Sequence, residues 1–434
     1  MAQTQNNRQG GNRPPAKKPV KRQRKPAPPA ERPVRRGKTT DERIRSLHTV
    51  VLINIAITVL ALVIAVVSLG VAISACSSNG SGGGTAGGGG GVPGGNIDDN
   101  AGDNPDTTPA AAAARLERYL SRADFEELFP RRFGSQGWHD WPANAGRQEE
   151  EYYSYDNLKE AMRRIANIKV RLEQREGITW GLGRVSVYNK TTGVWTTIVT
   201  DVDFSASWNA QRPIITQEVD FGSFLAVGSQ NDRRRELAAF LANIAHETTG
   251  GWPTAPGGRF AWGLFFNEEV GFAGATASPY VRPDNPNFPP APGRSYHGRG
   301  PIQLSWNCNY GLFSAIFFDG DISVLLDNPH TVVECGVLGF MTALAFWMMP
   351  QGRPSCHQIM TRTWQPTAAD IAAGRGNLGF GLTIMVINGG IERNLTIADG
   401  RIYSRVGFYR MIAARTGADI AGEQLDTAGM SPWG

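Results

Sequence analysis

A chain of 434 residues is long enough for one large domain or two medium ones with appendages. The formal net charge of +5 averages two unlike parts, because residues 1–46 carry 14 Lys and Arg against 3 Asp and Glu, whereas the remainder carries 30 basic and 36 acidic residues. The mildly acidic body gives no electrostatic reason to expect a nucleic-acid ligand. The four cysteines include no CxxC pair, which disfavours a zinc ribbon or a thioredoxin-type site.

The first 75 residues predict a membrane anchor. Residues 1–46 are rich in Pro, Lys and Arg and lack apolar periodicity, which predicts a basic, disordered cytoplasmic tail. The segment 47–75 has no charged residue after position 48 and, at about 1.5 Å per residue, is long enough for a transmembrane helix. Its apolar run exceeds the ~7–15 residues of a signal peptide. The basic residues before it predict a single-pass protein with a cytoplasmic N-terminus and an extracytoplasmic body.

A second kind of anchor stays open at the end of this apolar run. Ile73-Ser74-Ala75-Cys76 resembles a bacterial lipoprotein cleavage box, so that a lipid on Cys76 is the alternative to a membrane-spanning helix. The following residues, 76–113, are rich in Gly, Ser and Pro and predict a flexible linker.

The body is expected to fold from about 114 to 420, with a C-terminal tail at 421–434. Apolar spacing predicts helices near Leu116, over 157–173, and over 331–349 and 401–416, while 178–222 suggests a small β-hairpin. The clearest helix is 232–247, where Leu237, Phe240 and Leu241 begin an apolar face, and Ser229 with Asp232 fits a capping box. The pattern predicts a mostly helical domain with few strands.

Carboxylates in aromatic surroundings are the first candidates for chemistry. His246-Glu247 at a helix end suggests a zinc protease, but that motif needs a second His at position 250, where the chain has Gly. Glu247 then remains as an acid beside Trp252, and Glu269 follows an aromatic run. Glycoside hydrolysis uses two such carboxylates, one protonated and one ionised.

Four ordered blocks carry a family resemblance. AHETTGGWPTAPGGRFAWG, GRGPIQLSWNCNYG, INGGIE and RVGFYR resemble the signature blocks of glycoside hydrolase family nineteen, the plant-type chitinases. The similarity runs from about 116 to 418, with an insertion at about 165–222. It implies a mainly α, lysozyme-like, two-lobed chitinase domain over 114–420. To this fold the residue pattern adds a small β insertion and one preceding transmembrane helix. The resemblance also implies endo-acting, inverting hydrolysis of β-1,4-linked N-acetylglucosamine polymers.

The resemblance assigns roles to individual residues. Glu247 matches the general acid, Glu269 the general base, and Ser305 the residue that helps to hold the attacking water. Substrate-binding or acid-tuning positions are matched by Gln303, Asn309, Asn388, Glu392 and Arg405, and His246 and Trp252 are further candidates for substrate binding. Arg353 stands where the family often has Lys, and His297 where it commonly has Tyr. No metal or organic cofactor is expected, because both reacting groups are carboxylates.

The expected partners are chitin or a related aminosugar polysaccharide and the membrane, with the oligomeric state left open. Two other functions fit the same sequence. A peptidoglycan-degrading, lysozyme-like enzyme would share the fold class and the chemistry. A non-catalytic chitin-binding or attachment protein on a cell or virion surface is the other, although a pure binder has no need of Glu247, Glu269 and Ser305 together.

Overall fold

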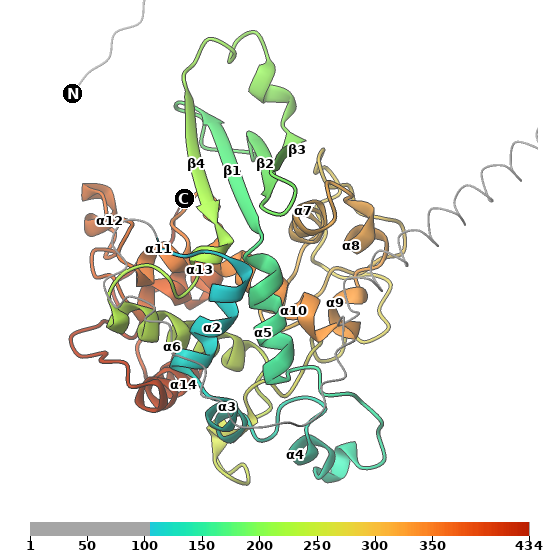
Figure 1. Cartoon of the computed structure of the whole chain (residues 1–434), viewed down its shortest axis with the longest axis vertical. Helices are drawn as coiled ribbons and strands as arrows, with labels where there is room; N and C mark the ends of the chain where they lie inside the picture. Colours follow the sequence, from blue (N-terminus) through green and yellow to red (C-terminus); the bar gives the residue numbers. More distant parts are fainter. Residues whose placement is uncertain (1–104, 434) are drawn as a thin grey trace, which may run out of the picture. The chain divides into compact units, whose positions relative to one another are not determined.

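The computed structural model describes residues 105–433 (Figure 1). The predicted cytoplasmic tail, the transmembrane segment 47–75 and most of the linker lie outside these described residues, as does Cys76. Across 105–433, no helix is both long enough and apolar enough to cross a membrane.

Helices dominate the described chain, and one antiparallel sheet accompanies them (Figure 1). The helices are α2 (Pro109–Tyr119), α3 (Arg122–Leu128), α4 (Gln136–His139), α5 (Tyr155–Ile165), α6 (Gln230–Glu247), α7 (Asn307–Phe317), α8 (Ser323–Asp327), α9 (Thr331–Glu334), α10 (Gly336–Met348), α11 (Cys356–Met360), α12 (Ala368–Ala372), α13 (Phe380–Glu392) and α14 (Gly400–Thr416). The strands are β1 (Ile168–Arg175), β2 (Arg184–Asn189), β3 (Val194–Thr200) and β4 (Ile214–Asp220). The expected helix-rich fold with a small sheet is confirmed for this part of the chain.

Helix α6 is the central element of the core. The capping box is present, because the Ser229 side chain accepts from the Asp232 N–H while the Asp232 carboxylate accepts from the Ser229 N–H. The sequence predicts one apolar face, but every residue from Leu237 to Ala245 is buried. The helix packs against α14, α11 and α13, and its partly exposed residues lie only in its first turns (230–232 and 234) and at its last two positions. A helix buried on all sides is fixed in position, which matters because it ends at Glu247.

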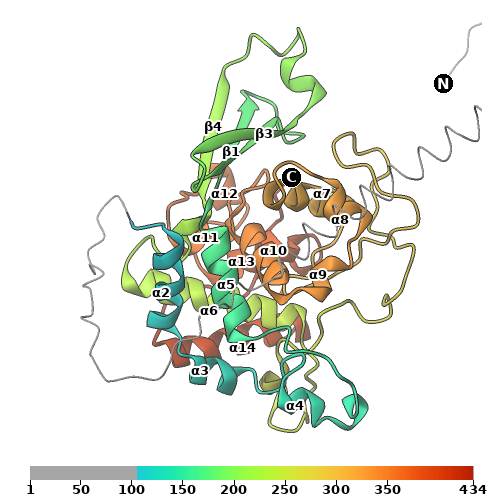
Figure 2. The same cartoon turned by 45° about the vertical axis from the view of Figure 1, so that its right-hand side comes forward.

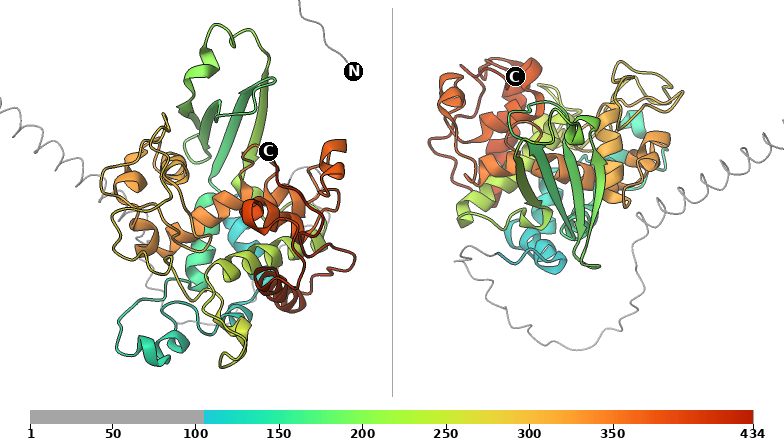
Figure 3. Two further views of the ribbon diagram at one scale, coloured as in Figure 1. Left: turned by 180° about the vertical axis from the view of Figure 1, so that it is seen from behind. Right: turned by 90° about the horizontal axis from the view of Figure 1, so that it is seen from above.

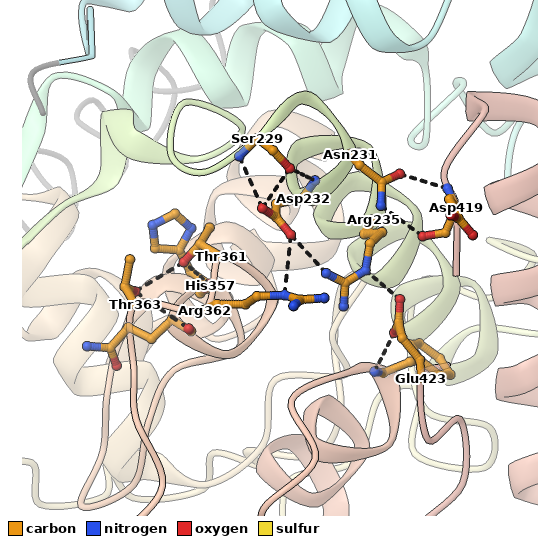
Figure 4. A network of polar contacts seen from close by, with 12 residues as sticks. Ser229, Asn231, Asp232, Arg235, His357, Thr361, Arg362, Thr363, Asp419 and Glu423 are labelled. Atoms are coloured by element: carbon orange, nitrogen blue, oxygen red, sulfur yellow. Dashed lines mark hydrogen bonds and ion pairs between the residues drawn. The ribbon is translucent and has the colours of Figure 1, made fainter. Parts of the chain in front are cut away.

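A polar network fastens the start of α6 to the C-terminal segment (Figure 4). The guanidinium of Arg235 is buried and donates to Glu423 at 2.5 Å and to Asp232 at 2.9 Å. Asn231 exchanges hydrogen bonds with the backbone of Asp419. The segment 421–433, expected as a tail, therefore packs on the domain, and Met430 is buried in the same core.

The insertion forms a sheet with strand order β3-β2-β1-β4, in which each pair of adjacent strands is antiparallel. Figures 1 and 2 show it at one end of the helices, and Figure 3 shows its strands side by side from above. The predicted hairpin is β2–β3. The helix predicted over 157–173 is wrong beyond Ile165, because Ile168, Val170 and Leu172 alternate with charged residues, and Val170 pairs with Val219 of β4.

The remaining predicted helices are found with one change. The helix expected at 401–416 is α14, but the one expected at 331–349 is divided into α9 and α10 at Cys335, whose backbone is extended. Gly336 lies against the carbonyl oxygen of Tyr152, which an added Cβ would approach to 2.1 Å. The close approach of Tyr152 explains why glycine follows the break.

The buried Arg235–Glu423 pair predicts a large loss of stability on truncation. Replacing Glu423 by Ala leaves the buried guanidinium short of a partner, so that the free energy of unfolding should fall by about 3–5 kcal/mol. Glu127→Ala is the matched control, because its ion pair with Arg415 is exposed and should contribute only about 0–1 kcal/mol. Urea unfolding of both variants checks this, and equal losses would contradict the importance of the buried pair.

Candidate active site

The C-terminal end of α6 places Glu247 beside a fixed loop. The Thr248 hydroxyl donates to the carbonyl of Ile244 at 2.6 Å, and the Thr248 carbonyl accepts from the N–H groups of Phe265 at 3.0 Å and Phe266 at 2.9 Å. Gly250 packs so closely on Phe265 that an added Cβ would lie 2.6 Å from the ring. A second metal-binding histidine therefore has no room at position 250, and the loop from 262 to 269 is held against the end of α6.

A buried arginine links Glu247 to a second carboxylate. Arg405 of α14 is fully buried and donates through Nη2 to Glu247 at 2.5 Å and to Glu392 at 2.8 Å, while its Nε donates to Glu392 at 2.9 Å. Burial alone would lower the pKa of Arg405, but the charges of Glu247 and Glu392 raise it well above its usual value. Burial likewise opposes ionisation of Glu392, yet the hydrogen bonds from Arg405 lower the pKa of this carboxyl.

Two amides complete this cluster around Arg405. Asn388 donates to Glu392 at 2.7 Å from a position where α13 is kinked, with φ −140° and ψ 26°. Asn243, buried within α6, accepts from Arg405 Nη1 at 3.0 Å and donates to the Thr383 hydroxyl at 3.0 Å. The structure thus brings Glu247, Glu392, Arg405 and Asn388 into one hydrogen-bonded cluster.

Glu269 is held on the neighbouring loop by donors on both of its oxygens. The Tyr280 hydroxyl donates to Oε1 at 2.8 Å, and the Gly298 N–H donates to Oε2 at 2.9 Å. Burial together with the hydrogen bond to Glu269 raises the pKa of Tyr280 to about 12, so the phenol remains a donor near neutral pH. Two donors on a half-buried carboxylate stabilise its negative charge.

The adjacent Glu268 lies in a different environment. It contacts the buried ring of His297 at 2.8 Å, Arg299 at 3.2 Å and the half-exposed His330 at 3.8 Å. Burial opposes ionisation, but hydrogen bonds from His297 and His330 and the charge of Arg299 hold the pKa of Glu268 well below its usual range. Glu268 is therefore an ion-paired carboxylate that fixes His297 and Arg299, which distinguishes it from Glu269.

The turn after Gly298 carries three more of the predicted residues. Ser305 donates to the Gln303 carbonyl at 3.0 Å, and Asn309 donates to the Ser305 carbonyl at 2.9 Å. Gln303 and Trp306 have positive φ values of 51° and 76°, which for residues other than glycine is a strained backbone that clusters at functional sites. Since Gly298 binds Glu269 through its N–H and its carbonyl, this turn is joined directly to the second carboxylate.

Gln303, Ser305 and Asn309 make no described hydrogen bond to a carboxylate of the site, and neither do the three remaining predicted residues. Trp252 is 36% exposed and packs on Trp262, with ring centroids 5.0 Å apart. The Nδ1 atom of the partly exposed His246 is buried and lacks a hydrogen-bond partner among residues 105–433, and burial and the charge of Arg405 hold the pKa of His246 well below the usual value. Arg353 likewise has an unpaired Nε within the described chain, and burial lowers its pKa.

Sequence reasoning missed two residues that position the site. Asn243 could have been noticed as an amide within the apolar stretch from Leu237 to Ala245, because a buried amide requires hydrogen-bond partners. Tyr280 lies in an irregular loop eleven residues after Glu269, and no periodic pattern marks it.

Comparisons with known proteins show which family the chain belongs to. The family model for chitinase class I, glycoside hydrolase family 19, matches residues 203–427. Chitinase 10 of Oryza sativa subsp. japonica is 47% identical over 215 residues, which cover 49% of this chain and 70% of that protein. An endochitinase of Carica papaya is 46% identical over 219 residues, covering 49% and 84% of the two chains. Inactive chitinase-like protein 1 of Hevea brasiliensis is 43% identical over 216 residues, covering 49% and 65%. The chain therefore belongs to glycoside hydrolase family 19, the class I chitinases.

Proposed function

We propose that this chain is an endo-acting, inverting chitinase that cleaves β-1,4-linked N-acetylglucosamine polymers, with Glu247 as the general acid and Glu269 as the general base. The observation that carries the proposal is the pair of carboxylates on adjoining segments, one bonded to a buried arginine and the other held by two neutral donors. Family membership supports the same substrate class. The two-lobed arrangement implied by the resemblance is part of the proposal.

The surroundings of Glu247 suit a group that gives up a proton. When Glu247 protonates the glycosidic oxygen, it becomes a carboxylate, and the adjacent guanidinium of Arg405 stabilises that new charge. Arg405 is shared with Glu392, so the charge of one arginine is divided between two carboxyl groups.

The surroundings of Glu269 suit a group that receives a proton. Tyr280 and Gly298 are neutral donors, and each orients one oxygen of the Glu269 carboxylate. In an inverting reaction the base removes a proton from a water that attacks the anomeric carbon on the face opposite the leaving group. Ser305 lies on the turn joined to Glu269, and its hydroxyl would form a hydrogen bond with that water.

The other matched side chains are proposed to bind the polymer. Amides such as Gln303, Asn309 and Asn388 can hydrogen-bond to sugar hydroxyls and acetamido groups, and the exposed face of Trp252 can stack on a sugar ring. His246 and Arg353 have unpaired buried ring or guanidinium nitrogens, which a ligand could satisfy.

A non-catalytic role is the alternative that the comparisons make concrete, since one relative is named an inactive chitinase-like protein. Membership of the family alone therefore does not establish turnover. The presence of Glu247, Glu269 and Ser305 in connected positions favours an enzyme. Peptidoglycan remains the competing substrate because its backbone linkage requires the same chemistry.

The assignment of the two carboxylates predicts the effect of amide substitutions. Glu247→Gln removes the transferable proton but keeps the shape, so kcat on N-acetylglucosamine oligomers should fall by at least about 10²–10⁴-fold while oligomer binding changes little. Glu269→Gln should lower kcat comparably, and Ser305→Ala less.

The matched control is Glu268→Gln, in which the neighbouring acid is changed in the same way. Folded Glu268→Gln protein should keep most of its turnover, because the Glu268 carboxylate is already paired with His297 and Arg299. Normal turnover in Glu247→Gln, or equal losses in the Glu268 and Glu269 variants, would overturn the assignment. Assays on peptidoglycan fragments in parallel identify the preferred polymer.

We also propose that the chain is a single-pass membrane protein whose catalytic body lies outside the cytoplasm. The argument is the uncharged run within 47–75 and the 14 basic residues that precede it. A substrate that is an extracellular polymer fits this location.

This topology predicts that protease added to intact cells removes the body. Cys76→Ser protein should stay in the membrane fraction, because a spanning helix needs no lipid. Survival of the body under protease would contradict the topology, and release of Cys76→Ser protein would favour the lipid anchor.

A further inference from the structure

A cavity of about 200 Å³ lies between the inserted sheet and the loop that follows the second carboxylate. Its walls come from the β1–β2 connection, from the segment after β3 and from residues 285–287, and none of the proposed catalytic residues lines it. The lining residues used below are Trp180, Asp201, Phe204, Asn209 and Asn287.

Asn209 lines this cavity and carries a buried acceptor that is unsatisfied. Its side chain is 1% exposed, and its Nδ2 donates to the Asp203 carbonyl at 2.8 Å. That bond fixes the orientation of the amide, because turning it over would place two oxygens in contact. The Oδ1 atom has no hydrogen-bond partner among residues 105–433. A buried acceptor without a donor costs about 1–3 kcal/mol, so the site is suited to a ligand that donates a hydrogen bond.

Trp180 adds a flat apolar face to the same cavity. Its side chain is 54% exposed although its backbone is fixed, because Gln174 donates to its carbonyl at 3.0 Å. Within the described chain its indole makes no ring stacking and no hydrogen bond. Phe204, by contrast, is buried, with the guanidinium groups of Arg175 and Arg184 over its ring at 4.8 and 4.9 Å. An ordered but uncovered tryptophan beside an amide acceptor is suited to stack on the apolar C–H face of a sugar ring.

The charges in the cavity exclude an anionic ligand. No lysine, arginine or histidine lines it, and the acidic residues that do would repel a phosphate or a carboxylate. Asp201 is already occupied, because it accepts from the Leu182 and Gly183 N–H groups at 2.6 and 2.7 Å and from Asn287 at 2.5 Å. The volume is below the ~300–1,000 Å³ of sites for drug-sized ligands, so it fits a single ring. A neutral, hydroxyl- or amide-bearing ring is the class of ligand that remains.

A chain of hydrogen bonds connects this cavity to the loop that carries Glu269. Asn287 ties that loop to Asp201 of the insertion, and Asn307 holds it through the backbone of Arg282 and Phe288. Tyr280, earlier on the same loop, bonds to Glu269. The insertion is therefore attached to the loop that carries the second carboxylate.

We propose that the insertion carries a second carbohydrate site, in which one N-acetylglucosamine unit of a chitin chain stacks on Trp180 and donates a hydrogen bond to Asn209. This proposal rests on the proposed function for the identity of the sugar. The role of this second site is to hold a long or insoluble polymer while Glu247 and Glu269 act on another sugar unit.

Binding to insoluble chitin tests the second site. The full chain carries Glu247→Gln, so that no substrate is consumed, and is compared with the same chain that also carries Trp180→Ala. Loss of the stacking face should weaken binding about 3–10-fold, and Trp180→Phe should recover most of it. In chains with Glu247 intact, Trp180→Ala should lower the ratio of the rate on insoluble chitin to that on the soluble N-acetylglucosamine tetramer by a similar factor.

Trp208→Ala is the matched control, because this tryptophan is also 54% exposed on the insertion but does not line the cavity. It should bind as the parent does. Unchanged binding by Trp180→Ala, or equal losses in both tryptophan variants, would overturn the proposal, the first indicating a cavity filled by water and the second unspecific adsorption. Cleavage of the tetramer by the unmodified chain is measured separately, so that a failure of the proposed function is distinguished from a failure of the second site.

Discussion

The site depends on one buried cation. A guanidinium that is fully removed from water must be paired, and Arg405 meets this need with Glu247, Glu392 and Asn243. These partners come from α6 and α13, while Arg405 belongs to α14, so a single side chain fixes three helices relative to each other. The same contacts that satisfy Arg405 determine where Glu247 lies. They also place the positive charge of Arg405 beside Glu247 once this acid has lost its proton.

The second carboxylate is positioned by backbone geometry. The loop from 262 to 269 bonds to the end of α6 through Thr248, and Glu269 bonds to Gly298, so that both acids and the turn bearing Ser305 belong to one hydrogen-bonded unit. Hydrogen bonds to backbone groups do not require a particular side chain, and this explains how the arrangement tolerates His297 at a position where the family commonly has Tyr. The inserted sheet is joined to the same unit from the other end of the loop.

Local patterns predicted those features that depend on local interactions. The capping box at Ser229 and the end of α6 at Glu247 follow from neighbouring residues, and so does the exclusion of a zinc site at Gly250. Most of strand β1 was predicted as helix because its apolar spacing is short and its pairing with β4 joins residues 39 to 51 apart in the chain. The packing of residues 421–433 and the role of Asn243 were missed for the same reason, since both depend on partners distant in sequence. The catalytic assignment came from the family resemblance, as spacing alone left two isolated acids.

The central claim is that Glu247 and Glu269 act on opposite faces of the scissile bond, with water as the nucleophile. The anomeric form of the first product reports this directly, because a single displacement inverts the configuration whereas a covalent intermediate retains it. Proton NMR of a freshly mixed β-linked N-acetylglucosamine oligomer and enzyme should show the α-anomer at the new reducing end before mutarotation. Initial release of the β-anomer would contradict the assignment of Glu269 as a base that activates water.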